Sequence, residues 1–86
     1  MGDGYIGKLA RSKAGHDSGK IYVIIAENSA YVYLVDGRIR TLSRPKKKKK
    51  KHIQIIHENY DVHNIDDVGI KRILKEWKKE EVKQED

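Results

Sequence analysis

Six consecutive lysines, Lys46 to Lys51, restrict what this chain can fold into more than any other segment. A run without an apolar residue offers no face that a hydrophobic core could bury. We therefore expect neither a barrel strand nor a core helix from these residues alone, and we expect the whole run to be exposed. The core must come from the segments on either side.

Those segments are short, apolar and separated by turn-forming residues. Lys20 to Ala26 is rich in β-branched residues and too short for a typical helix, so it predicts a buried strand. Asp36 and Gly37 favour a two-residue hairpin turn, because both residue types tolerate positive φ. Five strands are predicted in all: Tyr5 to Arg11, Lys20 to Ala26, Ala30 to Val35, Arg38 to Leu42 and His52 to His57.

After Asn64 the apolar spacing changes to that of a helix. Four apolar residues recur at i, i+3, i+4 and i+7, namely Ile70, Ile73, Leu74 and Trp77. We predict a linker over 58–65, an amphipathic helix over 66–80 capped by Asn64 or Asp66, and a polar tail over 81–86. We favour packing of this apolar stripe on the sheet, since a lone helix is marginal in water. The alternative is a contact with a protein partner.

Positive charge is concentrated in the first part of the chain. Residues 1–57 contain 13 basic and 4 acidic side chains, whereas residues 58–86 contain 6 basic and 9 acidic ones. A basic domain of this kind attracts polyanions, and nucleic acid is the obvious candidate.

Several classes of protein and site receive no support. The chain has no cysteine, no apolar run long enough for a membrane span and no signal-peptide pattern near its first residues, so we expect a cytoplasmic protein without a membrane partner. The four histidines lack zinc-site spacing, and no nucleophile accompanies the adjacent His16 and Asp17. We therefore predict no metal, no cofactor, no catalytic residue and no enzymatic activity.

The segment from Ile6 to Gly37 resembles the KOW motif. Its matching parts are Ile6 to Ala10, the loop Gly15 to Gly19 and the strand Ile21 to Ile25. Tyr33 to Arg38 is similar to the Leu-Val-Asp-Gly segment of the ribosomal large-subunit protein fourteen-e family and its bacterial relatives, which also tend to have a proline and a lysine run next. The resemblance implies an SH3-like five-stranded barrel over residues 1–57, including the basic segment 44–51, that binds RNA.

The resemblance also implies where RNA would bind, at the glycine loop and the neighbouring strand ends. The matching residues are Lys13, His16, Lys20, Arg38 and Arg40. Backbone N–H groups in a loop containing Gly15 and Gly19 can bind phosphate oxygens, although the same glycines could merely permit a tight turn. Arg44 and the lysines of the run could add further phosphate contacts, these lysines being Lys46, Lys47, Lys48, Lys49, Lys50 and Lys51.

The lysine run has other interpretations, namely a solvated linker, a nuclear-localisation-like patch or a contact with an anionic membrane surface. The tyrosines could stack on unpaired bases if Tyr31 and Tyr33 face outward and Val32 and Leu34 face the core.

Together these features predict a mainly β protein with one C-terminal helix that binds structured RNA, ribosomal or otherwise linked to translation. The alternative is a protein-interaction module of SH3-like type, which would use the sheet or the C-terminal helix and leave the lysines as solvated charges.

Overall fold

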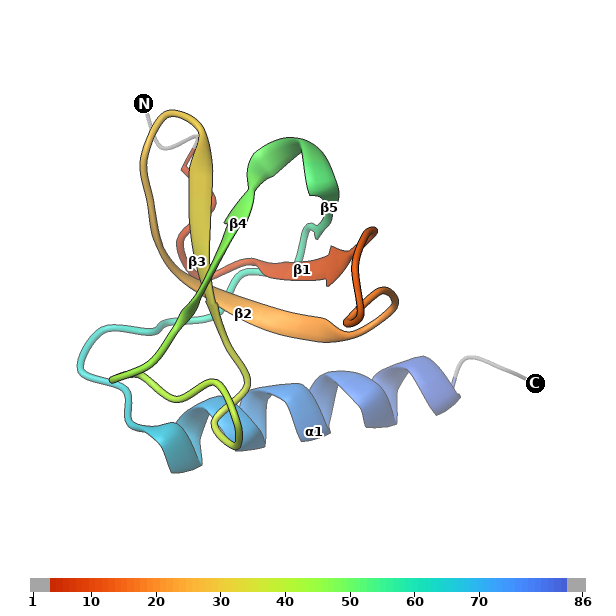
Figure 1. Cartoon of the computed structure of the whole chain (residues 1–86). Helices are drawn as coiled ribbons and strands as arrows, with labels where there is room; N and C mark the ends of the chain where they lie inside the picture. Colours follow the sequence, from red (N-terminus) through yellow and green to blue (C-terminus); the bar gives the residue numbers. More distant parts are fainter. Residues whose placement is uncertain (1–3, 84–86) are drawn as a thin grey trace.

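The computed structural model describes residues 4–83, and in this range the chain forms one antiparallel sheet and one long helix (Figure 1). The sheet has the strand order β4-β3-β2-β1-β5. The elements are β1 (Leu9–Ser12), β2 (Ile21–Glu27), β3 (Tyr31–Val35), β4 (Lys46–Lys49), the short 3₁₀ helix η1 (Lys50–His52), β5 (Ile53–Ile56) and α1 (Asp67–Lys83). A mainly β chain with five strands and a C-terminal helix is confirmed.

Alternation along the strands gives the sheet two apolar faces. One face carries the inner cluster, formed by Ala10, Tyr22, Ile24, Val32, Leu34 and Ile53. The other face carries the helix-side cluster, formed by Leu9, Val23 and Val35 of the sheet together with Ile70 and Trp77 of α1. Neighbouring residues such as Leu34 and Val35 belong to different clusters, as expected for side chains that point to opposite faces of a strand.

The fourth strand is not where we predicted it. Arg38 to Leu42 forms no strand, and the lysine run supplies β4 instead, with Lys46 opposite Leu34 and Lys49 opposite Tyr31. The prediction that the run could not form a strand was wrong, because backbone hydrogen bonds to β3 do not require apolar side chains. Lysine is also a common residue on edge strands, where its charge opposes pairing with other chains.

The Asp36-Gly37 pair forms a turn, but the turn leads into a loop and not into a returning strand. The Asp36 carboxylate accepts hydrogen bonds from the N–H groups of Arg38 and Arg40 at 2.8 and 2.9 Å. Gly37 has φ of +79°, and a Cβ atom there would lie 2.6 Å from the backbone oxygen of Asp67. The glycine is needed both for the turn and for the close approach of this loop to α1.

The N-terminus of α1 is capped by a side chain and is hydrogen-bonded to the loop that follows β3. The Asp66 carboxylate accepts a hydrogen bond from the N–H of Gly69 at 2.8 Å, so the cap is Asp66, one of the two predicted candidates. The Asp67 carboxylate accepts one from the N–H of Leu42, also at 2.8 Å. The helix continues through Lys83, so residues 81–83 belong to it and not to a separate tail, whereas residues 84–86 lie outside the described part of the chain.

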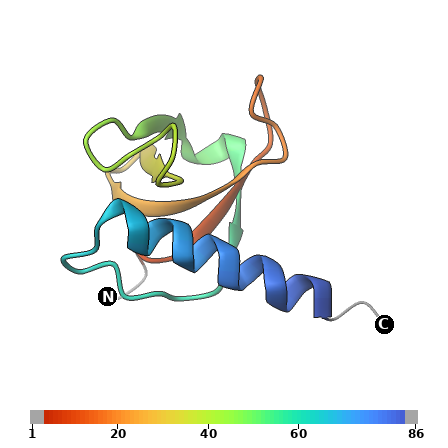
Figure 2. The same ribbon diagram turned by 90° about the horizontal axis from the view of Figure 1, so that it is seen from below.

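The apolar stripe of α1 packs against the sheet. Figure 2 shows the helix lying across one face of the strands. Ile70 is fully buried and Trp77 almost so, and the half-buried Ile73 and Leu74 join them against the helix-side cluster. Intramolecular packing of the stripe, the interpretation we favoured, is confirmed. Within the described residues, no helix combines the length and the apolar character that a membrane span needs.

We predict that Ile70→Ala lowers the free energy of unfolding by about 2–5 kcal/mol, because it leaves a cavity between α1 and the sheet. Val68→Ala is the matched control, since Val68 lies two residues away and its side chain is exposed. Urea unfolding followed by Trp77 fluorescence measures both. Equal stability of the two variants would contradict the packing of α1 on the sheet.

Candidate nucleic-acid interface

The lysine side chains of the run alternate between two environments. Lys46 and Lys48 are half-buried, with 26% and 10% of their side chains exposed, whereas Lys47 and Lys49 are exposed. Beyond the strand, Lys50 is half-buried and its ammonium lies 3.1 Å from the Glu27 carboxylate. The prediction that the whole run is exposed was therefore wrong for these three lysines. Lys46 and Lys48 turn inward because a strand directs alternate side chains to opposite faces, whereas Lys50 is held by Glu27.

The inward-facing lysines bind a buried carboxylate, that of Asp17. The Lys48 ammonium donates a hydrogen bond to Asp17 Oδ1 at 2.9 Å, and the Lys46 ammonium lies 3.5 Å from Oδ2. Ser12 Oγ donates to Oδ1 at 3.0 Å and the Tyr22 hydroxyl donates to Oδ2 at 3.2 Å. We call these five residues the Asp17 cluster. They join the glycine loop to β1, β2 and β4.

The cluster shifts the pKa values of its own members. Burial by itself raises the pKa of Asp17, but the hydrogen bonds from Lys48 and Ser12 and the positive charges of Lys46 and Lys48 outweigh it and hold this pKa well below its ordinary value. Burial and the neighbouring Asp17 charge raise the pKa of Tyr22 to about 12. At neutral pH the carboxylate is therefore ionised and the phenol remains a hydrogen-bond donor.

The glycine loop is held in one conformation by its own backbone and by β4. The N–H of Gly19 donates to the Ser12 oxygen at 2.8 Å, and the Lys48 ammonium donates to the Ala14 oxygen at the same distance. Gly15 and Gly19 have φ of +88° and +90°. A Cβ at Gly19 would meet no atom within 4 Å, so this glycine is needed for its backbone conformation and not for space.

Some backbone N–H groups of the loop have no acceptor in the described part of the chain. Its own backbone hydrogen bonds use the N–H groups of Ser18, Gly19 and Lys20. The N–H groups of residues 14–17 have no hydrogen-bond acceptor within residues 4–83. The side chains of Lys13, His16 and Lys20 are exposed around them.

Outside the loop, the outward-facing lysines share a surface with two tyrosines. Tyr31 and Tyr33 are half-buried, whereas Val32 and Leu34 are fully buried, so the tyrosines occupy the outer side of β3. They lie opposite Lys49 and Lys47 of β4, and the Lys47 ammonium stands 4.4 Å from the centre of the Tyr31 ring. We call these four residues the β3–β4 outer face. The ring of Tyr31 holds a cation in place and is partly covered by it.

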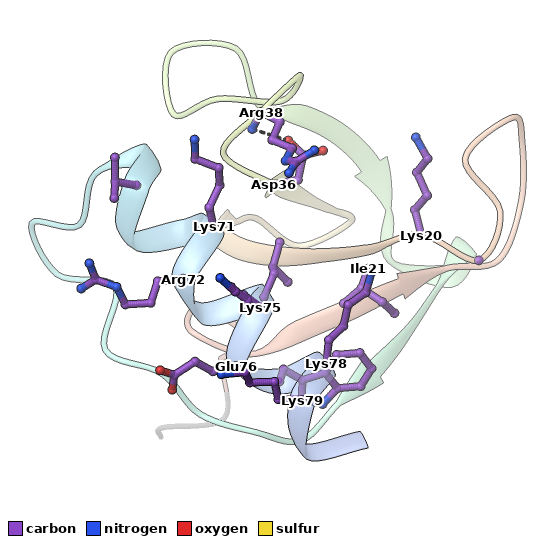
Figure 3. Close-up of a pocket in the computed structure, with 14 residues that line it drawn as sticks. Lys20, Ile21, Asp36, Arg38, Lys71, Arg72, Lys75, Glu76, Lys78 and Lys79 are labelled. Atoms are coloured by element: carbon purple, nitrogen blue, oxygen red, sulfur yellow. Dashed lines mark hydrogen bonds between the residues drawn. The ribbon is translucent and has the colours of Figure 1, made fainter. Parts of the chain in front are cut away.

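The predicted arginines occupy the connection between β3 and β4. Arg38 and Arg44 are exposed and Arg40 is half-buried. Figure 3 shows Arg38 and Lys20 bordering a groove along α1, so the structure brings together two residues that we predicted from separate loops. Within residues 4–83, no three His, Asp or Glu side chains come together to hold a metal ion.

Sequence reasoning missed Asp17 and the basic residues of α1. An aspartate between two glycines is an ordinary turn residue, and nothing in the sequence indicates that Lys46 and Lys48 reach it across 29 or 31 positions. The lysines of α1 did carry a signal, since Lys71, Lys75 and Lys79 are spaced four residues apart and therefore share a helix face.

Neither the protein-family models nor the curated proteins compared with this sequence give a match. The resemblance to the KOW motif thus stays a prediction based on the residues quoted for it.

We predict that the stability contributed by Asp17 decreases in acid. Its pKa is lower in the folded chain than in the unfolded chain, so the contribution is complete above about pH 4 and is lost as the pH falls below that value. Asp17→Asn should lower the free energy of unfolding at neutral pH by about 3 kcal/mol, because it leaves Lys48 without its buried partner.

Urea unfolding of the parent and of Asp17→Asn at pH values of about 7, 5 and 3 tests this, with the exposed Glu58→Gln as the control. The difference between the parent and Asp17→Asn should shrink as the pH falls. A difference that is constant over this range would contradict the assigned role of the carboxylate.

Proposed function

We propose that this chain is an RNA-binding protein of ribosomal or translation-associated type, and that it binds through phosphate contacts without catalysing a reaction. The observation that carries the proposal is the arrangement of the β3–β4 outer face, where Lys47 and Lys49 stand exposed beside two tyrosines. Basic and aromatic side chains on one sheet surface are suited to the charge and the bases of RNA.

The rigidity of the neighbouring loop supports the same proposal. Lys48 and the Asp17 cluster fix the loop against β4, the strand whose other side carries Lys47 and Lys49. The unpaired N–H groups of residues 14–17 and the exposed Lys13 and Lys20 would bind phosphate oxygens there. A preformed loop loses little conformational entropy when it binds.

We further propose that the sheet is an SH3-like barrel of KOW type. The two edge strands, β4 and β5, follow one another in the chain and are joined only by the three residues of η1. The inner cluster collects side chains from β1, β2, β3 and β5 around one apolar centre. A short turn between the two edges of a strongly bent five-stranded sheet is the connection that such a barrel requires.

The alternative function, a protein-interaction module, has less support. The apolar stripe that would bind a partner is already used against the sheet, since Ile70 and Trp77 are buried. The large apolar side chains that are exposed within the described residues, Ile6, Ile39 and Val68, come from three separate segments. Single exposed apolar residues are normal on a protein surface.

We predict that Lys47→Gln/Lys49→Gln weakens binding to a labelled single-stranded RNA of mixed sequence. Loss of two phosphate contacts should lower the slope of log K against log salt by about 1.4 and the affinity on the order of tenfold at physiological salt. The thermal midpoint should not fall, because both side chains are exposed. Fluorescence anisotropy over a series of salt concentrations measures the slope and the affinity.

The alternation of β4 provides the matched control. Lys46→Gln removes the same charge from the neighbouring position, but Lys46 faces Asp17, so it should change RNA affinity less than Lys47→Gln does. Equal effects of the two single variants would mean that only net charge matters. Unchanged RNA binding in the Lys47→Gln/Lys49→Gln variant would exclude the β3–β4 outer face as the binding surface.

A further inference from the structure

A groove of about 1090 Å³ runs between α1 and the loops at the start of β2 and the end of β3. Its apolar floor is formed by Ile21, Leu74 and Trp77, which are buried or half-buried, and the exposed Val68 also lines it. In Figure 3 the walls come from opposite sides, with Lys71 and Lys75 on the helix and Lys20 and Arg38 on the loops. This groove is distinct from the β3–β4 outer face.

The walls of the groove are strongly basic. Asp36 and Glu76 are its acidic residues, and the Asp36 carboxylate already accepts hydrogen bonds from the N–H groups of Arg38 and Arg40. The basic residues that line it are Lys20, Arg38, Lys71, Arg72, Lys75, Lys78 and Lys79, all of them exposed. Residues 58–86 have an acidic excess, but α1 itself carries six basic and four acidic residues, and the helix turns most of its positive charges toward one side.

The lysines of α1 repeat at one-turn intervals along the groove. Lys71, Lys75 and Lys79 occupy positions i, i+4 and i+8, so their Cα atoms are offset by about 6 Å along the helix axis. Like charges at this spacing destabilise a helix, and no carboxylate in the described side chains lies within ion-pair distance of Lys71 or Lys75. An anion in the groove would relieve this repulsion.

The packing of the loop against the helix brings the two walls together. A Cβ atom at Gly37 would lie 2.7 Å from Cγ of Lys71, so only a glycine lets the Arg38 loop approach the helix this closely. On the other side, Lys20 follows Gly19 directly and continues the basic glycine loop into the groove. The groove is thus continuous with the loop proposed to bind RNA.

We propose that this groove binds the sugar–phosphate backbone of RNA, as a second contact surface that extends the one on the glycine loop. The inference rests on the proposed function and adds α1 to it. Phosphates repeated along a strand match cations repeated along a helix, and the apolar floor suits contact with the ribose. Lys20 and Arg38 would lie where the strand passes from the loops onto the helix.

The test is Lys71→Gln/Lys75→Gln, assayed with the same labelled single-stranded RNA. Two lost phosphate contacts should lower the salt slope by about 1.4 and the affinity on the order of tenfold at physiological salt. The thermal midpoint should stay equal to that of the parent or rise, because repulsion along the helix is removed. Weaker binding by a chain of equal or higher stability separates loss of contact from loss of folding.

Lys8→Gln is the control for a single charge, to be compared with Lys71→Gln and Lys75→Gln. Lys8 lies outside the groove, and its ammonium donates to Asn59. It should change the affinity less than either helix variant. An equal effect of all three single variants would overturn the inference, since it would reflect net charge alone.

Two further outcomes separate this inference from the proposed function. If the helix variant binds RNA like the parent while Lys47→Gln/Lys49→Gln binds weakly, the groove inference is wrong and the proposed function stands. If the parent itself shows no salt-dependent RNA binding, the proposed function fails first. Polyglutamate serves as a probe for an acidic protein. If the parent binds it, and Lys71→Gln/Lys75→Gln does not bind it but still binds RNA like the parent, the groove is a site for an acidic protein and the inference is wrong.

Discussion

The contact between Asp17 and the lysines of β4 connects the parts of this protein that would otherwise be separate. One buried carboxylate accepts hydrogen bonds from β1, β2 and β4, through Ser12, Tyr22 and Lys48. An ionised group in such a place is stable only if it is hydrogen-bonded and faces opposite charge, and Asp17 meets both conditions. The lysine run can therefore form the edge of the sheet, because every second lysine faces a negative charge and the others face water.

The same interaction determines which lysines are available to a ligand. Because Lys46, Lys48 and Lys50 are paired with Asp17 or Glu27, the outward charge of the run comes from Lys47, Lys49 and Lys51. Six identical residues thus divide into a structural set and a surface set. The structural set also holds the glycine loop, through the bond from Lys48 to the Ala14 oxygen. Fold stability and the shape of the proposed binding surface therefore depend on the same side chains.

Charge on this protein is organised by surface and not by segment. The division of the sequence into a basic first part and an acidic second part is correct as a count, but it does not describe what a ligand would meet. Helical periodicity turns Lys71 and Lys75 toward Lys20 and Arg38, and the absence of a side chain at Gly37 lets the two walls approach. The resulting groove combines basic residues from both parts of the chain.

The sequence by itself determined the elements whose pattern is local. The β-branched segments predicted β2 and β3, and the four apolar residues of α1 predicted the helix and its buried face. The cap was narrowed to Asn64 or Asp66, and the structure has Asp66 in this role. The alternation of Val32 and Leu34 with two tyrosines was visible as well. Of the candidate site, the exposed positions of the glycine loop and of Lys47, Lys49 and Lys51 could be predicted from composition and loop chemistry.

Only the tertiary structure decided the rest, because the deciding partners are far apart in the chain. Lys48 pairs with a carboxylate 31 positions earlier, and Gly37 packs against Asp67 and Lys71 of α1, 30 and 34 positions later. Lysine residues carry no intrinsic preference that would reveal either fact, since a strand edge stabilised by ion pairs has no apolar pattern. The run of lysines that most restricted the possible folds was therefore itself placed by backbone pairing with β3 and by long-range ion pairs, which a local pattern does not contain.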